Sequence, residues 1–217
     1  MRQLEAGLRA GLATLSLDLS DAQVSQCLDY LELIQKWNKV YNLTAVRDPA
    51  EMLTHHLLDS LTAIAPLRLH TQGRAINLLD VGSGAGLPGV VIAICCPEIK
   101  VTCVDAVSKK AAFVQQAALT FKLPNLRGLH ARVESLIQPY DVVCSRAFAA
   151  LSDFANWSRS ALAAEGVWLA MKGKIPTEEI ANLAGTAEVF HVEQLQVPAL
   201  EAQRCIVWMR RVSVPST

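Results

Sequence analysis

The fold of this chain is decided by the stretch LLDVGSGAGLPG, residues 78–89. Residues 76–81 carry the side chains of a largely buried strand, and glycines then follow at positions 82, 84, 86 and 89. Glycine adopts left-handed turns and lets a ligand approach the backbone closely. A strand that leads through such a turn into a helix is typical of nucleotide-binding α/β proteins. The stretch therefore predicts both a fold and a ligand site.

Two glycine fingerprints overlap in this loop. From Gly84 it matches the dinucleotide pattern Gly-x-Gly-x-x-Gly, and from Asp80 it matches the pattern Asp-x-Gly-x-Gly-x-Gly of Rossmann-like proteins that hold S-adenosylmethionine. A carboxylate before the first glycine repels a pyrophosphate but attracts an ammonium or a sulfonium group. We therefore favour S-adenosylmethionine, with Asp80, Gly82, Gly84 and Gly86 as cofactor-binding residues. A nicotinamide oxidoreductase stays open as an alternative.

A second carboxylate, Asp105, ends the next predicted strand, VTCVD at residues 101–105. A carboxylate at the end of this strand can accept hydrogen bonds from both hydroxyls of a ribose. Asp105 is therefore a further cofactor-binding candidate, and it indicates a nucleoside without deciding between the two cofactors.

Short β-rich runs alternate with helical segments through the second part of the chain. We predict strands over residues 76–81, 101–104, 126–130, 141–144 and 167–171, which favours an α/β fold with a parallel sheet covered by helices on both faces. Residues 189–197 and 204–212 read as two strands without a helix between them. They predict an antiparallel hairpin at the sheet edge. A mostly parallel sheet that ends in an antiparallel edge strand is the usual architecture of Rossmann-like class I methyltransferases.

The N-terminal part is predicted to be helical. Ser20 and Gln23 form a capping box before a run with helical apolar spacing, in which we interpret Trp37 and Tyr41 as core residues. Asp48 and Pro49 start a second helix that runs towards residue 64. We therefore expect residues 1–70 to form a helical region packed on the same domain, and residues 71–217 to form the S-adenosylmethionine-binding methyltransferase core.

Composition limits the classes of function. The chain has 217 residues, of which 52% are hydrophobic and 18% charged, as in one large globular domain. It has neither an apolar run of about 20 residues nor the pattern of a secretory signal, so we expect a cytoplasmic protein without a membrane partner. The balance of 20 basic and 20 acidic residues argues against coating of naked nucleic acid by net charge, although a local basic patch stays open.

Cysteine and histidine spacing gives no sign of a metal site. The six cysteines form no Cys-x-x-Cys pair and lie mostly in apolar runs, which favours buried, reduced thiols. Of the five histidines only His55 and His56 are neighbours, and successive helical residues point about 100° apart. We expect no metal.

Five segments together resemble one family, RsmG, also called GidB or glucose-inhibited division protein B. They are WNKVYNLT at residues 37–44, HLLDS at 56–60, DVGSGAGLPG at 80–89, RVE at 132–134 and SRAF at 145–148. The resemblance implies a bacterial methyltransferase that modifies guanine N7 in the decoding-region loop of 16S ribosomal RNA. Its partner would be this RNA, free or in a small-subunit particle, and we expect a monomer. A methyltransferase of another acceptor and a non-catalytic ribosome assembly factor stay open as alternatives.

The same resemblance implies roles for further residues. Gly82 and Leu87 would line the S-adenosylmethionine pocket, Val133 and Glu134 would lie beside the adenosine, and Arg146 would reach the cofactor from the end of the fourth strand. Guanine N7 carries a lone pair and no proton, so no catalytic acid or base is expected. The enzyme would act by aligning the two reactants.

Four lysines are candidates for RNA binding. Lys109 and Lys110 lie at a predicted helix start, where a cation is unfavourable unless it meets an anionic partner. Lys172 and Lys174 flank the end of the fifth predicted strand, at the edge where ligands bind in such sheets. A solvated helix face is the alternative interpretation of the first pair.

Overall fold

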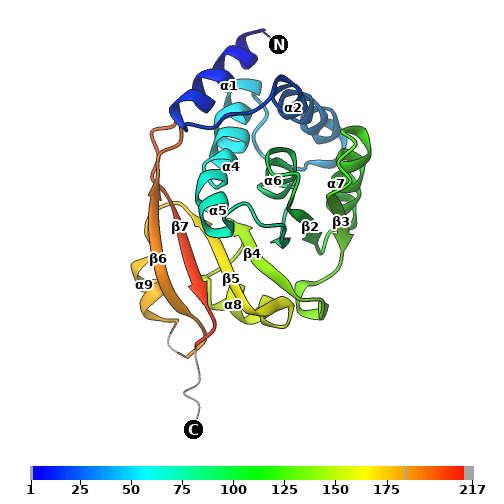
Figure 1. Ribbon diagram of the computed structural model, residues 1–217. Coiled ribbons are helices and arrows are strands. Elements are labelled where there is room, and N and C mark those ends of the chain that lie inside the picture. Colours follow the sequence, from blue (N-terminus) through cyan, green and yellow to red (C-terminus); the bar gives the residue numbers. More distant parts are fainter. Residues whose placement is uncertain (1, 184, 213–217) are drawn as a thin grey trace.

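The computed structural model describes residues 2–183 and 185–212. Its centre is a seven-stranded sheet in the order β3-β2-β1-β4-β5-β7-β6 (Figure 1). The strands are β1 (Asn77–Val81), β2 (Lys100–Asp105), β3 (Leu126–His130), β4 (Tyr140–Arg146), β5 (Leu162–Lys172), β6 (Glu188–Leu195) and β7 (Arg204–Arg210). β1 to β5 pair in parallel, and β7 pairs antiparallel with both β5 and β6. The predicted α/β class, the parallel set and the antiparallel hairpin are confirmed.

Helices cover both faces of the sheet. One face carries α6 (Gly89–Cys95), α7 (Ser108–Thr120) and the N-terminal helices, and the other carries α8 (Leu151–Ser158) and α9 (Thr177–Ala181) (Figure 1). Alternate residues of β1 enter the two cores, Leu78 on the α6 side and Leu79 on the α8 side. Every residue of α6 is buried, because this helix lies between the sheet and the N-terminal helices.

The N-terminal helices are α1 (Arg2–Thr14), α2 (Asp21–Tyr41), α3 (Pro49–Met52), α4 (Asp59–Leu61) and α5 (Ile64–Thr71). Both predicted start signals are confirmed: Ser20 forms a capping box with Gln23, and Asp48 accepts hydrogen bonds from the first turn of α3. Gln23 also donates to the carbonyl of Ile94 in α6 at 2.8 Å. The helical region therefore packs on the sheet domain, while a domain boundary near residue 70 stays a prediction.

The second helix departs from the regular form that its sequence predicts. Between α3 and α4, Leu53–Leu58 form a π-helix, η1, and α4 follows directly. A wider helical turn shifts the side chains that follow it, and such turns are frequent at functional sites. Here the turn carries His55 and His56, which both line a cavity described below.

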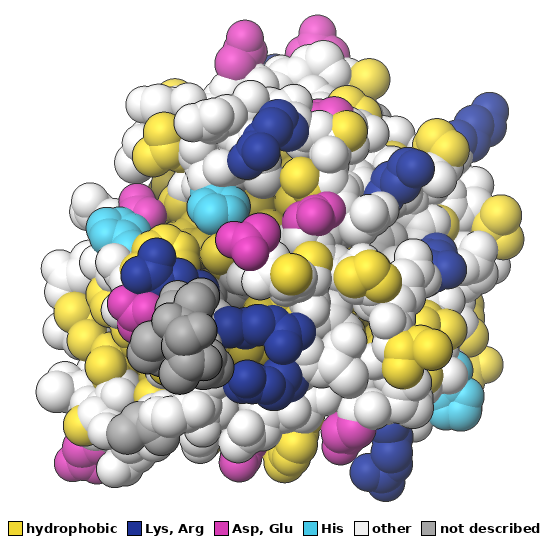
Figure 2. All heavy atoms as spheres, turned by 60° about the horizontal axis from the view of Figure 1, so that its bottom comes forward, with side chains coloured by type: hydrophobic (Ala, Val, Ile, Leu, Met, Phe, Trp, Pro, Cys, Tyr) yellow, Lys and Arg dark blue, Asp and Glu magenta, His cyan; other side chains and the backbone are white. Residues whose placement is uncertain are grey.

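The face around the C-terminal end of the described chain carries a group of Lys and Arg side chains (Figure 2). Arg211 lies beside Arg159, to whose carbonyl it donates a hydrogen bond of 2.8 Å. Because β7 runs antiparallel to β5, the C-terminal end of β7 lies on the side of the sheet where the parallel strands begin. Arg211 and Arg159 therefore lie at the opposite end of the strands from the carboxyl ends of the parallel set.

All six cysteines are buried free thiols, as predicted. Within the described residues, no helix is both long enough and apolar enough to cross a membrane. Nor do any three His, Cys, Asp or Glu side chains of the described segments gather into a group that could hold a metal ion.

Candidate functional site

Two cavities open at the carboxyl ends of β1, β2 and β4. Cavity 1 has a volume of about 500 Å³ and cavity 2 of about 450 Å³, and both are lined by Gly82 and Ala147. Cavity 1 also has in its wall Thr44, His55, His56, Asp59, Gly84, Leu87, Arg146, Lys172 and Arg204. Cavity 2 also has in its wall Asp105, Lys110, Val133, Glu134, Phe148 and Trp157. An elongated ligand that crosses Gly82 could occupy both.

The glycine loop shapes the junction of the two cavities. Gly82 has a φ of 63°, and a Cβ there would collide with the ring of Phe148. Gly84 has a φ of 59° and open space where a Cβ would point, so a ligand can approach its backbone. Ala147 on the opposite wall has a φ of 51°, which is uncommon for a residue with a Cβ. Such strained positions cluster at functional sites.

Gly86 and Asp80 serve the loop rather than the cavity walls. Gly86 has a φ of 84°, a Cβ there would collide with Val90, and neither cavity includes it. Asp80 is fully buried, and its Oδ2 accepts a hydrogen bond of 2.8 Å from the backbone of Gly89. The expected contact of this carboxylate with a cationic ligand is therefore not the geometry observed. Asp80 instead joins the end of β1 to the first residue of α6.

Burial also changes the charge of Asp80. Removal from water raises the pKa of this carboxyl to about 7, although the hydrogen bond from Gly89 acts in the opposite direction. Its Oδ1 has no hydrogen-bond partner among the described residues. The sequence pattern predicts that Asp80 meets the ligand as an anion, whereas in the structure its carboxyl is buried beneath the loop, and its role in cofactor binding stays a prediction.

Asp105 occupies the expected place at the end of β2, in the wall of cavity 2. Its Oδ2 accepts from the backbone of Gly84 at 3.0 Å, and its Oδ1 accepts from the backbone of Val107 at 2.9 Å. Lys110 reaches the same carboxylate at 3.7 Å. Lys110 therefore faces the predicted nucleoside site, whereas its neighbour Lys109 is exposed on the first turn of α7.

The far wall of cavity 2 combines expected and unexpected residues. Val133 and Glu134 lie in a short helical turn, η2 (Val133–Ser135), and both line the cavity. Phe148 and Trp157 also line it, with their ring centroids 5.8 Å apart in an edge-to-face arrangement. Sequence reasoning missed the two aromatic residues as site residues, although Phe148 belongs to the segment SRAF at residues 145–148.

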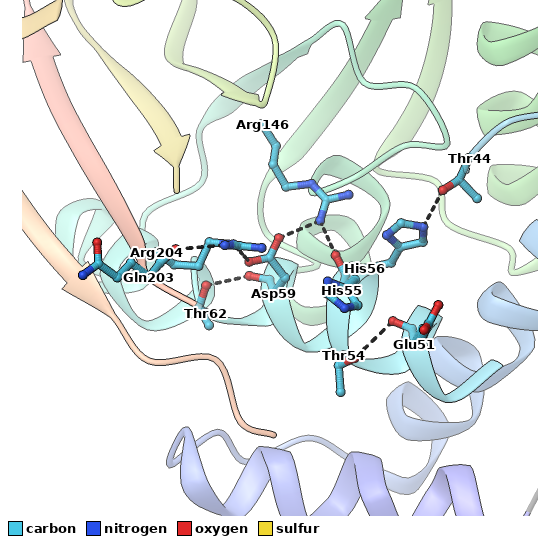
Figure 3. Close-up of polar contacts among 10 residues, drawn as sticks. All are labelled: Thr44, Glu51, Thr54, His55, His56, Asp59, Thr62, Arg146, Gln203 and Arg204. Atoms are coloured by element: carbon cyan, nitrogen blue, oxygen red, sulfur yellow. Dashed lines mark hydrogen bonds and ion pairs between the residues drawn. The ribbon is translucent and has the colours of Figure 1, made fainter. Parts of the chain in front are cut away.

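Arg146 reaches cavity 1 from the end of β4, and Asp59 holds it there. Its Nη1 donates to Oδ2 of Asp59 at 2.8 Å and to the carbonyl of His55 at 2.9 Å (Figure 3). The other carboxylate oxygen of Asp59 accepts from Nε of Arg204 at 2.9 Å. Asp59 is 4% exposed, so one buried carboxylate orients two guanidinium groups. Neither Asp59 nor Arg204 is among the site residues predicted from the sequence.

His56 closes the neighbouring wall of cavity 1. Its Nε2 lies 2.8 Å from the hydroxyl of Thr44, in the segment that follows α2 (Figure 3). Burial and the positive charge of Arg146 lower the pKa of this imidazole, which favours its neutral form. His56 therefore joins the N-terminal helices to the cavity wall as an uncharged side chain.

The two lysines at the end of β5 line one groove beside α9, but only the first forms an ion pair with another described residue. Lys172 lines cavity 1, but its Nζ is bound to Oε2 of Glu179 and to the carbonyl of Ala149, both at 2.8 Å. Lys174 is exposed and, together with Lys172, lines a groove beside α9. Glu179 pairs with the first lysine within the fold, and the role of both lysines in RNA binding stays a prediction.

Known sequences match almost the whole chain. Residues 23–207 match the family described as "GidB: rRNA small subunit methyltransferase G". A protein named ribosomal RNA small subunit methyltransferase G from Polaromonas sp. is 69% identical over 214 residues, which cover 97% of this chain and 95% of the relative. A protein of the same name from Acidovorax ebreus is 66% identical over 218 residues, covering 97% and 96%.

Solved structures of methyltransferases share the fold. A 1,6-didemethyltoxoflavin-N1-methyltransferase from Burkholderia thailandensis has a TM-score of 0.60 at 14% identity, covering 85% of this chain and 90% of that one. An S-adenosylmethionine-dependent methyltransferase from Aquifex aeolicus has a TM-score of 0.54 at 15% identity, covering 75% and 98%. Sequence and fold agree, and the chain belongs to the GidB family, that of rRNA small subunit methyltransferase G.

Proposed function

We propose that the chain transfers the methyl group of S-adenosylmethionine to N7 of a guanine in the decoding-region loop of 16S ribosomal RNA. The junction of the two cavities at Gly82 is the observation that supports this most directly. It provides one elongated site for a nucleoside with an amino-acid tail, open at cavity 1 to a second reactant. The family to which the chain belongs supplies the ribosomal RNA acceptor.

The residues present fit this methyl donor. In cavity 2, the carboxylate of Asp105 would accept the ribose hydroxyls, and Val133 and Glu134 would flank the adenine. At the junction, Gly82 and Gly84 leave room for the backbone to approach the ligand. When bound, S-adenosylmethionine supplies a methyl group on a positively charged sulfur.

The chemistry asks the chain for alignment rather than proton transfer. The lone pair of guanine N7 forms the new bond to the methyl carbon while the carbon–sulfur bond breaks. The electron pair of the broken bond stays on sulfur. No proton moves, so neither the neutral His56 nor the buried Asp80 needs to act as a base. Arg146, Asp59 and the glycine loop hold the two reactants in line, which is catalysis by proximity and orientation.

In a paired A-form helix, N7 faces a deep and narrow groove that side chains cannot enter. The target guanine must therefore lie in an unpaired loop or turn out of its helix to reach cavity 1. We propose free 16S RNA or an assembling small-subunit particle as the substrate. We also propose that the enzyme works as a monomer, which light scattering at working concentration would test.

Transfer of a radioactive methyl group tests the acceptor. Unmodified 16S RNA, the same RNA with the target guanine replaced by adenine, and small-subunit particles would each be incubated with the protein, and 7-methylguanosine would be located by chemical strand cleavage. We expect label at one guanine of the unmodified RNA or particle, and none in the substituted RNA. Label on protein or small molecules alone would support another acceptor. RNA binding without label would support an assembly factor.

A further inference from the structure

The last turn of α2 and the first turn of α7, beside cavity 1, carry exposed apolar and basic side chains that the proposed reaction does not use. We infer that this α2–α7 surface, formed by Lys39, Val40, Tyr41, Arg47 and Lys109, binds the single strand of RNA next to the target guanine. The inference rests on the proposed RNA substrate and specifies where that strand lies.

The packing of the two helices brings the last turn of α2 to the first turn of α7. Gln26 of α2 donates to the carbonyl of Phe121 just beyond α7, whereas Trp37 of α2 packs 5.4 Å from the ring of Phe113, nearer the start of α7. The helices therefore run antiparallel, and the last turn of α2 lies beside the first turn of α7. Leu43 and Thr44, which follow α2 directly, line cavity 1, so the surface borders the mouth of that cavity.

Three aromatic rings lead from the core to this surface. Phe113 is fully buried, Trp37 packs against it, and the ring centroid of Tyr41 lies 5.0 Å from that of Trp37 at an interplanar angle of 36°. Tyr41 is 39% exposed, so the series ends in an accessible ring. The neighbouring Val40 is 71% exposed. Interpretation of Tyr41 as a core residue is therefore wrong, because the end of α2 projects beyond the core.

An accessible aromatic ring is a suitable platform for an unpaired base. Every base has a flat face, so stacking on Tyr or Trp side chains binds single strands with little dependence on sequence. A ring already held by Trp37 loses little freedom when a base is added. Since Tyr41 lies two residues before Leu43 of cavity 1, a base stacked there would belong to a nucleotide close to the guanine.

The charges around Tyr41 favour a polyanion over a protein partner. Lys39, Arg47 and Lys109 are exposed, and none of them forms an ion pair with another described residue. The adjacent Asp48 accepts the backbone N–H groups of Ala50 and Glu51 and so serves as the cap of α3. Basic side chains combined with an aromatic platform bind a single strand through its phosphates and bases.

Variants of the surface test this inference with protein-free 16S RNA. We expect Tyr41→Ala to raise the KM for RNA about tenfold, the size of one stacking contact, and Tyr41→Phe to restore it. The double variant Lys39→Glu, Lys109→Glu should weaken RNA binding and reduce the slope of log affinity against log salt by about 0.7 for each lost phosphate contact. The Kd for S-adenosylmethionine should stay unchanged in all three, which also shows that they fold.

Residues at the other end of α7 provide matched controls. Leu119 is 67% exposed and Lys122 is exposed, so Leu119→Ala and Lys122→Glu remove the same kinds of side chain far from cavity 1 and should leave the KM unchanged. If the surface variants behave like these controls while the wild type methylates RNA, the inference about the α2–α7 surface is wrong and the proposed function stands. An effect on particles but not on free RNA would point to a ribosomal protein and also overturn it. A wild type that methylates neither free RNA nor small-subunit particles would refute the proposed function as well.

Discussion

Asp80 shows how burial changes the charge of a residue in a sequence motif. Its carboxyl has a pKa near 7 in the folded protein, against an ordinary value of 3.8, because it is buried. The folded state therefore binds a proton that the unfolded state releases between these two values. The contribution of this group to stability is greatest below about pH 4 and falls as the pH rises towards 7.

The variant Asp80→Asn tests this pH dependence, because an amide keeps the shape without the charge. Relative to the variant, the wild type should lose roughly 1 kcal/mol of unfolding free energy for each pH unit between pH 4 and pH 7. Urea unfolding at pH 5 and pH 7 measures it. Asp141 is exposed and accepts the backbone N–H of Asn77 at the start of β1, so Asp141→Asn is the matched control without burial. A wild-type advantage that grows with pH would contradict the account.

Asp59 is a positioning residue for Arg146. Asp59→Asn removes the anion that holds Arg146 and Arg204 and leaves two guanidinium groups close together. Loss of one partner of a buried pair typically costs about 3–5 kcal/mol, and we expect less here because both arginines keep some contact with water. Methyl transfer should fall at least about tenfold, a loss of about 1.4 kcal/mol in transition-state stabilisation.

The control for Asp59 is an ion pair outside the site. Glu188 and Arg210 form a bidentate pair between β6 and β7 that is about half exposed, so Glu188→Gln should leave transfer unchanged. If Asp59 acts through Arg146, adding Asp59→Asn to an Arg146→Ala protein should cost little more. Fully additive losses would show that Asp59 acts independently.

At the scale of elements, α2 supports the glycine loop through one buried hydroxyl. Tyr30 is fully buried, and its hydroxyl donates to the carbonyl of Ala85. Tyr30→Phe would leave this carbonyl without its partner, at a cost of about 1–3 kcal/mol in unfolding free energy. Because Ala85 lies between Gly84 and Gly86, the affinity for S-adenosylmethionine should fall too.

Calorimetric titration with S-adenosylmethionine measures the effect of Tyr30→Phe on the loop. Tyr140, the first residue of β4, provides the comparison. It is also buried, but its hydroxyl accepts from Arg127 at the end of the strands away from the glycine loop. Tyr140→Phe should therefore reduce stability without changing the affinity for S-adenosylmethionine. Equal affinities in the two variants would show that α2 does not position the loop.

Elements with local signals could be predicted, and elements that depend on distant packing could not. The caps at Ser20 and Asp48 are local, and the structure confirms both helix starts. The π-helix Leu53–Leu58 has the same side-chain types as a regular helix, so nothing in the sequence marks its shifted hydrogen bonds. Strand β5 begins at Leu162, whereas the sequence predicts a start at residue 167. The prediction missed this part because residues 163–166 lack the apolar pattern of a buried strand.

At the scale of the whole molecule, the site is a product of sheet order. The carboxyl ends of parallel strands lie on the same side of a sheet. Because Asp105 and the glycine loop both follow such strands, the sequence predicts that they lie side by side, as they do. The cluster of Asp59 with Arg146 and Arg204 joins residues 87 and 145 positions apart. No periodicity relates such distant residues, and only the packing of the N-terminal helices across the sheet edge brings them together.

Donor binding should stabilise the whole fold, because the site draws on β1, β2, β4 and the N-terminal helices. At a concentration about one hundred times its Kd, a ligand adds about 3 kcal/mol to the unfolding free energy. S-adenosylmethionine should therefore raise the melting temperature in a thermal-shift assay. NAD, the ligand of the rejected fingerprint, should leave it unchanged, and stabilisation by NAD instead would contradict the assignment of the loop.

The central claim is that the two cavities joined at Gly82 form one donor site. A crystal structure of the protein with S-adenosylhomocysteine, the product left after transfer, tests it most directly. We predict the ribose hydroxyls within hydrogen-bond distance of Asp105, the adenine between Val133 and Glu134, and the sulfur beyond Gly82 on the side of Arg146. A nucleoside outside cavity 2, or a sulfur that does not face cavity 1, would contradict the account.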